Sequence, residues 1–468
     1  MADDGGNGDG ATAGDCYAHH HRRDIKLAGD SSENLDSISS LPDVILQQIL
    51  SYLPTNLAIR TSVLSTRWRH LWYDTPSLYF DGPGTLYRGL KADTINKTLA
   101  RYKLPKIMSF HLYTNMLDNV PYIDDWIEFA ISRNVENLSL DCGESNGHGF
   151  HSIPEFIYTS SSVKQLSLRH CHLIPRCAVS WTSLKNLSLH TCSLSDEFFA
   201  KTLCGFPFLE SLKLFYVLNL MVLDLTKSLR LKTLEIYSYM FERGPMQIVA
   251  PHIHSLKLTK SKFSCTLVDV SSLTEATVEA IPEVDFRTLK QPKTLQVMTL
   301  KMLEKLQNVD KLTLGANFLK LLSISKVQGL SFPMFKAKAL TLETTMYLCV
   351  TPGVVSVLQN SPELQKLTLV HIMDCRSGFI QKDDLLYNFD PRGLNPDQRC
   401  CRCWVFERTL SLKTKHVASF MKIILKNTKT LEKMVVRLKD YLEERCFEEL
   451  LQIVPLLSID NNINIVLS

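Results

Sequence analysis

The side chains in this sequence best suited to chemistry are cysteines and histidines. Cys400, Cys401 and Cys403 lie close together and His416 follows them, so four potential zinc ligands share one short segment. Zinc sites usually pair Cys-x₂₋₄-Cys with a second ligand pair ~12–20 residues away, whereas a single histidine follows here. The other candidate, the histidine run 19–21, lies in a Gly- and Asp-rich tail that holds ligands poorly. We therefore expect no metal and no cofactor.

Patterns for covalent or phosphate chemistry are absent as well. The chain contains no GxxxxGK[ST] loop, no GxSxG turn and no HExxH helix. No cysteine stands in a recognisable nucleophile context, so thioester chemistry is not indicated. The sequence favours a protein that binds over one that catalyses.

Length and composition limit the class of protein. The 468 residues are enough for two or three domains, and 45% are apolar. A net charge of +4, from 52 basic and 48 acidic residues, is too balanced for a dedicated nucleic-acid binder. No apolar run is long enough for a transmembrane helix, and no signal peptide is visible. The thirteen cysteines should then be reduced, in the cytoplasm or the nucleus. Residues 1–36 are poor in large apolar side chains and are predicted to be disordered.

Residues 41–72 carry the pattern of a small helical module. Their apolar residues recur at helical spacing in pieces separated by Pro42, Pro54 and Ser65, which predicts three short helices. About 32 residues in that form bury little apolar surface by themselves. Part of the module should therefore be a docking face for another protein.

The middle of the chain repeats the unit apolar-x-x-Leu-x-Leu. Copies occur at Val135-x-x-Leu138-x-Leu140 and Val309-x-x-Leu312-x-Leu314, with weaker copies around Phe110 and Ala276. Most spacings lie in the ~20–29-residue window of leucine-rich repeats. Each copy predicts a short strand with one buried face, and stacked strands would form a parallel sheet on the concave side of a solenoid. Leu295-x-x-Met298-x-Leu300 is a further candidate copy.

The same pattern predicts which residues face outward. The side chain of the middle residue of each Leu-x-Leu should point out of the concave face, and so should that of the residue two positions later. Most of these middle residues are Ser or Thr, but three neighbouring copies differ. We nominate their outward residues as a substrate-binding surface, with a solvated sheet face as the alternative: Lys213, Phe215, Glu235, Tyr237 and Lys257. Cys171 and Cys192 follow the second leucine by three residues, where a side chain bonds backbone groups as the strand turns. They are expected to be structural.

After residue 390 the pattern changes. Trp404 to Leu412 alternates like a strand, and His416 to Lys426 has one apolar helical face. Leu431 to Val436 is strand-like, Glu443 to Val454 predicts a second amphipathic helix, and Ile463 to Leu467 predicts a final strand. Residues 391–468 therefore predict a small α/β cap over the open end of the repeats.

Two segments resemble known modules. Leu41-Pro42-Asp43, the apolar first helix, Val63-Leu64-Ser65 and the Arg67-Trp68-Arg69-x-Leu71-Trp72 close resemble an F-box. Leu431-Glu432-Lys433-Met434 resembles the FBD region that follows the repeats in many plant F-box proteins. The chain is thus similar to the F-box–LRR–FBD family over residues 37–468. This implies an F-box at 37–80, leucine-rich repeats at 100–390 and an FBD-like cap at 391–468.

The resemblance implies that the F-box binds a Skp-type adaptor and, through it, a cullin–RING ubiquitin ligase. The residues that would face the adaptor are Leu41, Pro42, Ile49, Leu50, Leu53, Val63 and Leu64. Trp68 fits either that face or the core. The chain would then be a non-catalytic substrate receptor of an SCF-type ligase, with a protein substrate on the repeats. Alternatives are a leucine-rich-repeat scaffold without ligase function, or nucleic-acid binding through Arg67, Arg69 and His70, whose charges are too few to favour it.

Overall fold

The computed structural model describes residues 38, 40–81, 90–143, 150–194, 196–197, 202, 205–237, 246–261, 265–280, 292–344, 346, 350–372, 414–438 and 444–468. Two compact units are formed, one ending at Leu46 and one spanning Gln47–Ser468. The tail 1–36, the cysteines at 400–403 and the strand predicted at 404–412 lie outside the described residues.

The N-terminal helices begin at prolines. Helix α1 (Asp43–Leu50) follows Pro42, and α2 (Thr55–Arg60) follows Pro54. Each proline carbonyl accepts hydrogen bonds from backbone N–H groups of the first turn, at 2.9–3.1 Å. Proline suits this position because its φ is helical and it lacks an N–H that the helix would leave unbonded. Helix α3 (Trp68–Leu71) follows, flanked by the 3₁₀ turns η1 (Thr61–Val63) and η2 (Trp72–Asp74). The predicted three short helices are confirmed.

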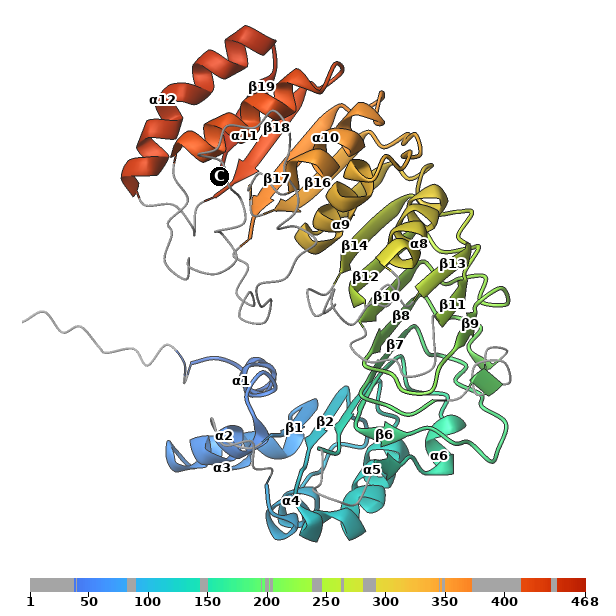
Figure 1. The fold of residues 1–468 in the computed structure, drawn as a ribbon. Coiled ribbons are helices and arrows are strands. Elements are labelled where there is room, and N and C mark those ends of the chain that lie inside the picture. Colours follow the sequence, from blue (N-terminus) through green and yellow to red (C-terminus); the bar gives the residue numbers. More distant parts are fainter. Residues whose placement is uncertain are drawn as a thin grey trace, which may run out of the picture. The chain divides into compact units, whose positions relative to one another are not determined.

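The rest of the chain is organised around one sheet in which every neighbouring pair of strands is parallel (Figure 1). The order in the sheet is the order in the chain, as repeats stacked one after another require. The strands are β1 (Ser77–Phe80), β2 (Ser109–Tyr113), β3 (Asn137–Asp141), β5 (Gln165–Arg169), β7 (Asn186–His190), β8 (Ser211–Phe215), β10 (Thr233–Tyr237), β12 (Ser255–Ser261), β14 (Glu275–Ala280), β15 (Lys311–Leu314), β16 (Ala339–Thr344), β17 (Lys366–His371), β18 (Lys433–Arg437) and β19 (Asn464–Leu467).

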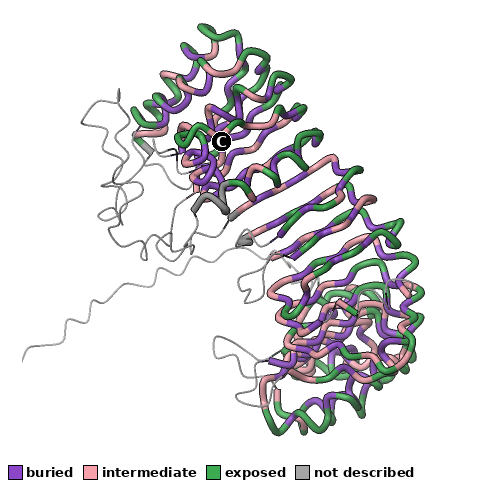
Figure 2. Tube along the Cα trace, turned by 45° about the vertical axis from the view of Figure 1, so that its right-hand side comes forward, coloured by how far each residue is buried: buried purple, intermediate pink, exposed green. Residues whose placement is uncertain are grey.

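The leucines of the repeats lie opposite one another in register. Leu166 pairs with Leu138 on one side and Leu187 on the other, and the pattern continues to Leu340 and Leu367. All of these side chains are buried, while the residues between them are half-buried or exposed apart from Thr368, so burial alternates along the strands other than β17 (Figure 2). The predicted α/β repeat fold is confirmed, including the weaker copies around Phe110 and Ala276.

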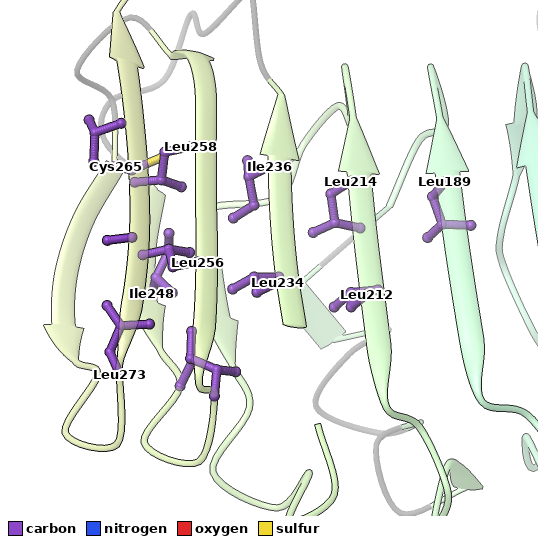
Figure 3. Close-up of a cluster of buried hydrophobic side chains, with 14 of the residues drawn as sticks. Leu189, Leu212, Leu214, Leu234, Ile236, Ile248, Leu256, Leu258, Cys265 and Leu273 are labelled. Carbon is purple, nitrogen blue, oxygen red and sulfur yellow. The ribbon is translucent and has the colours of Figure 1, made fainter. Parts of the chain in front are cut away.

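A second layer covers the face to which the leucines point. In the first half it contains short helices, a two-stranded sheet and a three-stranded sheet whose side chains meet the leucines (Figure 3). In the second half it consists of longer helices. The elements are α4 (Ala92–Leu99), η3 (Leu117–Tyr122), α5 (Ile123–Ser132), α6 (Glu155–Tyr158), β4 (His151–Ser152), β6 (Cys171–His172), β9 (Val222–Asp224), β11 (Met246–Val249), β13 (Cys265–Asp269), α8 (Pro292–Lys305), α9 (Ala316–Val327) and α10 (Thr351–Gln359).

One predicted repeat is wrong. Leu295-x-x-Met298-x-Leu300 lies within helix α8 and forms no strand. The spacing of Leu295 and Met298 also fits a helix, because residues three apart share a helical face. The long gap between β14 and β15 is therefore filled by a helix of the second layer.

The C-terminal segment extends the main sheet. Helix α11 (Thr414–Lys426) leads to β18, and α12 (Glu444–Asn461) leads to β19. Met434 pairs with Leu367 and Ile465 pairs with Met434, so the register of the repeats runs on into this segment. The predicted helices and the last two strands are present, and they cover β17 by adding strands to it.

Three strands end in a left-handed residue that is not glycine. His170, Thr191 and Tyr216 follow β5, β7 and β8 with φ of 56°, 49° and 53°. The turn sends the next residue back into the core, and for the first two strands that residue is Cys171 or Cys192, each fully buried. The thiols donate to the carbonyls of Arg169 and His190, at 3.2 and 3.3 Å, where these strands turn.

The buried carboxylate of Glu279 occupies space that Gly315 leaves open. It lies at the end of β14 across from Gly315, and a Cβ at Gly315 would stand 1.1 Å from its Oε2 atom. Asn317 Nδ2 donates to Glu279 Oε1 at 3.0 Å, while the buried Oε2 accepts no hydrogen bond from the described residues. Burial raises the pKa of Glu279 to about 7, although the Asn317 hydrogen bond acts in the other direction.

Cys171 and Cys192 should resist alkylation in the folded protein. Both side chains are inaccessible. The neighbouring thiol of Cys142, together with burial, raises the pKa of Cys171. Burial raises the pKa of Cys192 to about 12. Little thiolate therefore forms at either cysteine. Iodoacetamide labelling followed by mass spectrometry should find both unmodified after Cys177 and Cys446, which are partly exposed, have reacted. Labelling of all four at one rate, in protein shown to be folded, would contradict the repeat register.

Glu279 should make stability fall as pH rises. A carboxyl whose pKa is higher in the folded than in the unfolded state binds its proton more tightly when folded. The folded state therefore loses stability as the pH rises from 4.5, the ordinary pKa of a glutamate, to about 7, the pKa of Glu279 in the folded state. The loss is at most about 3 kcal/mol. The free energy of unfolding, measured by denaturation at pH 5 and at pH 8, should differ less between the two pH values for Glu279→Gln than for wild type. The exposed Glu363→Gln is the matched control, and equal pH dependence of wild type and Glu279→Gln would refute this role.

Candidate functional site

An exposed apolar surface lies on the helices at the start of the second unit. Its members are large apolar side chains that the described residues of the chain leave exposed to a large extent. Val63 and Leu64, at the corner formed by η1, are 87% and 65% exposed. We call this set the helical apolar surface: Ile49, Tyr52, Leu57, Val63 and Leu64. Soluble proteins seldom leave such a group open to water unless another molecule binds it.

Beneath this surface lies a small core. Leu50 is only 2% exposed, and Ala58, Trp68, Leu71 and Trp72 are buried as well. Leu50 was expected on the adaptor-facing side, and this is corrected: its side chain points away from water, where a partner cannot reach it. Trp68 is also buried, as its alternative assignment to the core requires. Leu53 is half-buried.

The first unit contains the other two expected adaptor residues. Pro42 is exposed, and Leu41 is half-buried. Val44 and Ile45, in the first turn of α1, are exposed large apolar residues that the sequence did not single out as contacts.

Hydrogen bonds fix the helices of the second unit to the sheet. The backbone N–H of Tyr79 in β1 donates to Thr55 Oγ1 in α2 at 2.7 Å. The hydroxyl of Tyr102 donates to the carbonyl of Thr75 at 2.7 Å, in a buried position. The first bond ties α2 to β1, and the second ties the residues after η2 to the segment between α4 and β2. The helical apolar surface is thus joined to the repeats by one part-buried and one buried hydrogen bond.

A second surface is formed by the outward face of the main sheet. Pairing between strands aligns the predicted middle residues in one row, which we call the outward row: Ser139, Ser167, Ser188, Lys213, Glu235, Lys257, Thr277, Thr313, Thr341 and Thr368. The side chains are half-buried or exposed, except for Thr368, which is buried. Residues two positions later form a parallel row.

Lys213, Glu235 and Lys257 form a line of ion pairs across three strands. Lys213 Nζ lies 3.5 Å from Glu235 Oε2, and Lys257 Nζ lies 3.0 Å from Glu235 Oε1. Burial alone would raise the pKa of Glu235, but hydrogen bonds and charges from Lys257 and Lys213 hold it below its ordinary value. Glu235 therefore stays ionised at neutral pH between the two lysines.

Aromatic rings lie beside this line of charges. The ring of Phe215 stacks on His190 with centroids 4.2 Å apart and planes within 3°. On its other side Phe215 meets Tyr237 at 5.9 Å, and Tyr216 meets the same tyrosine edge to face at 4.7 Å. Burial, and next the charge of Arg169, lower the pKa of His190 to about 4, so its ring is neutral at physiological pH.

Phe215 and Tyr237 do not belong to the core. They are half-buried, stand outside the cluster of buried leucines and share the outward face with Lys213 and Lys257. We call these four residues with Glu235 the mid-sheet patch. Two further features were not predicted from the sequence: the stacking of His190 on Phe215 and the approach of Tyr216, which depends on the left-handed turn after β8.

Other kinds of site find little support in the described part of the chain. No group of three or more His, Cys, Asp or Glu residues there is placed to hold a metal ion. The zinc candidate Cys400, Cys401 and Cys403 is outside that part. None of the described helices combines the length and the apolar character needed to cross a membrane. Arg67, Arg69 and His70 lie at α3 among buried Trp68 and Leu71 and form no extended basic surface.

Comparison with known proteins identifies both halves of the chain. The family model for the F-box domain matches residues 38–79, and the model described as the LRR domain of At1g61320/AtMIF1 matches residues 96–456. The second match runs through most of the segment expected to resemble an FBD region, an assignment that stays a prediction.

Relatives from Arabidopsis thaliana resemble the chain over nearly its whole length. The F-box/LRR-repeat protein At3g03360 is 48% identical over 448 residues, which are 92% of this chain and 91% of that protein. The F-box/LRR-repeat protein At5g02910 is 46% identical over 459 residues, 94% of this chain and 96% of that protein. Together with the exposed helical surface and the leucine register, these matches establish that the chain belongs to the F-box/LRR-repeat family.

Proposed function

We propose that this chain is the substrate-recognition subunit of an SCF-type E3 ubiquitin ligase. In this proposal the helical apolar surface docks on a Skp-type adaptor, and the adaptor connects the chain to a cullin–RING ligase. The outward face of the sheet holds a protein substrate. The chain itself carries out no chemistry and acts by bringing the substrate close to the ubiquitin-loaded enzyme.

The observation that carries the proposal is the exposure of Val63 and Leu64. A helical module that served only as a cap on the repeats would bury its large apolar residues against the sheet. Here Leu50, Trp68 and Leu71 form that core, and a second apolar set is left open to water. The bonds from the Tyr79 N–H to Thr55 and from the Tyr102 hydroxyl to Thr75 support the proposal, because they fix the helices relative to the first repeats and so limit the distance between adaptor and substrate.

The substrate arm of the proposal rests on the mid-sheet patch. Half-exposed aromatic rings and partly exposed lysines lie together there, on a sheet face whose other outward-row residues are Ser or Thr. Aromatic residues surrounded by polar groups often anchor a protein partner. We place this activity in the cytoplasm or the nucleus, where the buried thiols would remain reduced.

The second candidate function is a repeat scaffold whose helical module no longer engages a ligase. It shares the mid-sheet patch but predicts no adaptor binding. The two candidates therefore differ in one measurable interaction, which can be tested with purified components.

Charging the helical apolar surface should abolish adaptor binding. In Val63→Asp with Leu64→Asp, two apolar contacts are lost and two charges are buried against the partner, which costs about 2–4 kcal/mol or more. Affinity for a purified Skp-type adaptor, measured by calorimetry, should fall at least about thirtyfold. Both side chains are exposed, so the fold should be unaffected.

The matched control is Leu229→Asp with Ile459→Asp, two apolar residues that are 72% and 78% exposed elsewhere. This double variant should bind the adaptor as wild type does. If the wild-type chain fails to bind any Skp-type adaptor, the scaffold function replaces the ligase function. If the Val63/Leu64 variant binds normally, the docking surface is elsewhere.

A further inference from the structure

The outward row changes character over three strands only. From β3 to β16 its residues are serine or threonine, apart from Lys213, Glu235 and Lys257. Small hydroxyl side chains satisfy the needs of a solvated sheet face, so the fold itself does not require long charged ones here. On two of these strands the second row carries the rings of Phe215 and Tyr237, which stand in register. The mid-sheet patch is thus a local departure from the repeat pattern.

The rings of the patch are ordered before any partner arrives. His190 supports one face of Phe215 at 4.2 Å, and Ser188 Oγ lies 3.0 Å from His190 Nε2. Tyr237 is held between Phe215 and Tyr216. Rings that are fixed by their neighbours lose little freedom on binding, which favours them as anchors for an apolar side chain.

The charge beside the rings is positive. Two lysines share the single carboxylate of Glu235, which leaves a surplus of one positive charge in this line. The two lysine side chains are 49% and 50% exposed, whereas Glu235 is 20% exposed. An incoming group therefore meets ammonium groups first. Because His190 is neutral, it adds no further charge beside the ring of Phe215.

A third cation lies near the rings and is paired with a carboxylate. Arg169 stands next to His190 in the second row, and its Nε lies 3.4 Å from Asp141 Oδ2. Asp141 is already bound closely by His170 Nδ1 at 2.9 Å and by the backbone N–H of Gly143 at 3.1 Å. The contact of Asp141 with Arg169 is the longest of the three, and the side chain of Arg169 is 48% exposed.

We propose that the mid-sheet patch recognises an acidic peptide segment that carries an apolar anchor. The anchor side chain packs on Phe215 and Tyr237. Flanking carboxylates bind Lys213 and Lys257. The inference rests on the proposed function, since it names the chemical class of the substrate that the receptor takes.

A single-stranded nucleic acid would also use rings and cations, but it fits this surface less well. Glu235 lies between the two lysines, and Asp141 lies next to Arg169. A phosphodiester backbone carries a charge at every step and would pass over both carboxylates. A peptide can place its carboxylates opposite the lysines alone. Tighter binding of an oligonucleotide than of the peptide would therefore contradict the proposal.

The test is a selection from a random twelve-residue peptide library on the immobilised full chain. Wild type should enrich sequences with Asp or Glu on either side of a large apolar residue. The charge-reversed variant Lys213→Glu with Lys257→Glu should lose this preference and enrich Lys or Arg at the flanking positions. The control Lys366→Glu with Lys433→Glu, which reverses two exposed lysines at the starts of β17 and β18, should select as wild type does.

The enriched peptide is then synthesised with a fluorophore and titrated by anisotropy. Phe215→Ala and Tyr237→Ala should each weaken binding about tenfold or more. Raising NaCl from about 0.05 to about 0.3 M should also weaken it several-fold in wild type, and less in the charge-reversed variant. Thr313→Ala with Thr341→Ala, in the outward row beyond the patch, is the neutral control.

Three results would overturn the inference. The first is a selection with no acidic enrichment over the charge-reversed variant. The second is an enriched peptide that binds Phe215→Ala and Tyr237→Ala as tightly as wild type. The third is a labelled single-stranded oligonucleotide that binds wild type more tightly than the peptide and is weakened by the same variants.

Adaptor affinity measured on the same proteins separates this inference from the proposed function. All patch variants should bind the Skp-type adaptor normally, which also shows that they are folded. If wild type binds the adaptor but does not enrich acidic peptides, the inference is refuted and the ligase function stands. If wild type enriches acidic peptides but does not bind the adaptor, the ligase function is refuted and the chain is a peptide-binding scaffold.

Discussion

The in-register stacking of leucines from strand to strand is the constraint on which the rest of the structure depends. One repeat has too few apolar side chains to exclude water, so each pair of leucines is buried only because the next strand places its own pair alongside. Because side chains alternate along a strand, fixing the leucines inward also fixes the residues between them outward. The mid-sheet patch is a consequence of that register: Lys213 and Phe215 share a face because Leu212 and Leu214 occupy the other.

The sequence predicted this part of the fold well because the signal is local and repeated. It failed where the same spacing allows two structures, as at Leu295 to Leu300, whose leucines serve helix α8. It also missed β1 and the three-stranded sheet of β9, β11 and β13, because these short strands carry no repeated leucine pair. The turns after β5 and β7 were recognised from Cys171 and Cys192, whereas the matching turn at Tyr216 has no cysteine to mark it.

The candidate sites were predicted less completely, for a physical reason. Helical spacing shows that Ile49 and Leu50 belong to an apolar helix, but only tertiary packing decides that Leu50 is core and Ile49 is exposed. Strand alternation placed Phe215 and Tyr237 outward, yet the stack of His190 on Phe215 depends on the distance between neighbouring strands. Glu279 has a pKa near 7 because Gly315 leaves room for its buried carboxyl group, a relation between residues 36 positions apart.

The bond from Tyr79 to Thr55 has a consequence for solubility. β1 is the first strand of the sheet, so among the described residues one side of it pairs with no strand, and exposed strand edges of this kind recruit other chains into intermolecular sheets. Thr55 takes up one of the unpaired N–H groups there, and helix α2 packs against that strand. The helical module therefore acts as a plug against aggregation as well as a docking element. Repeats expressed without it would begin at an open edge and be prone to self-association.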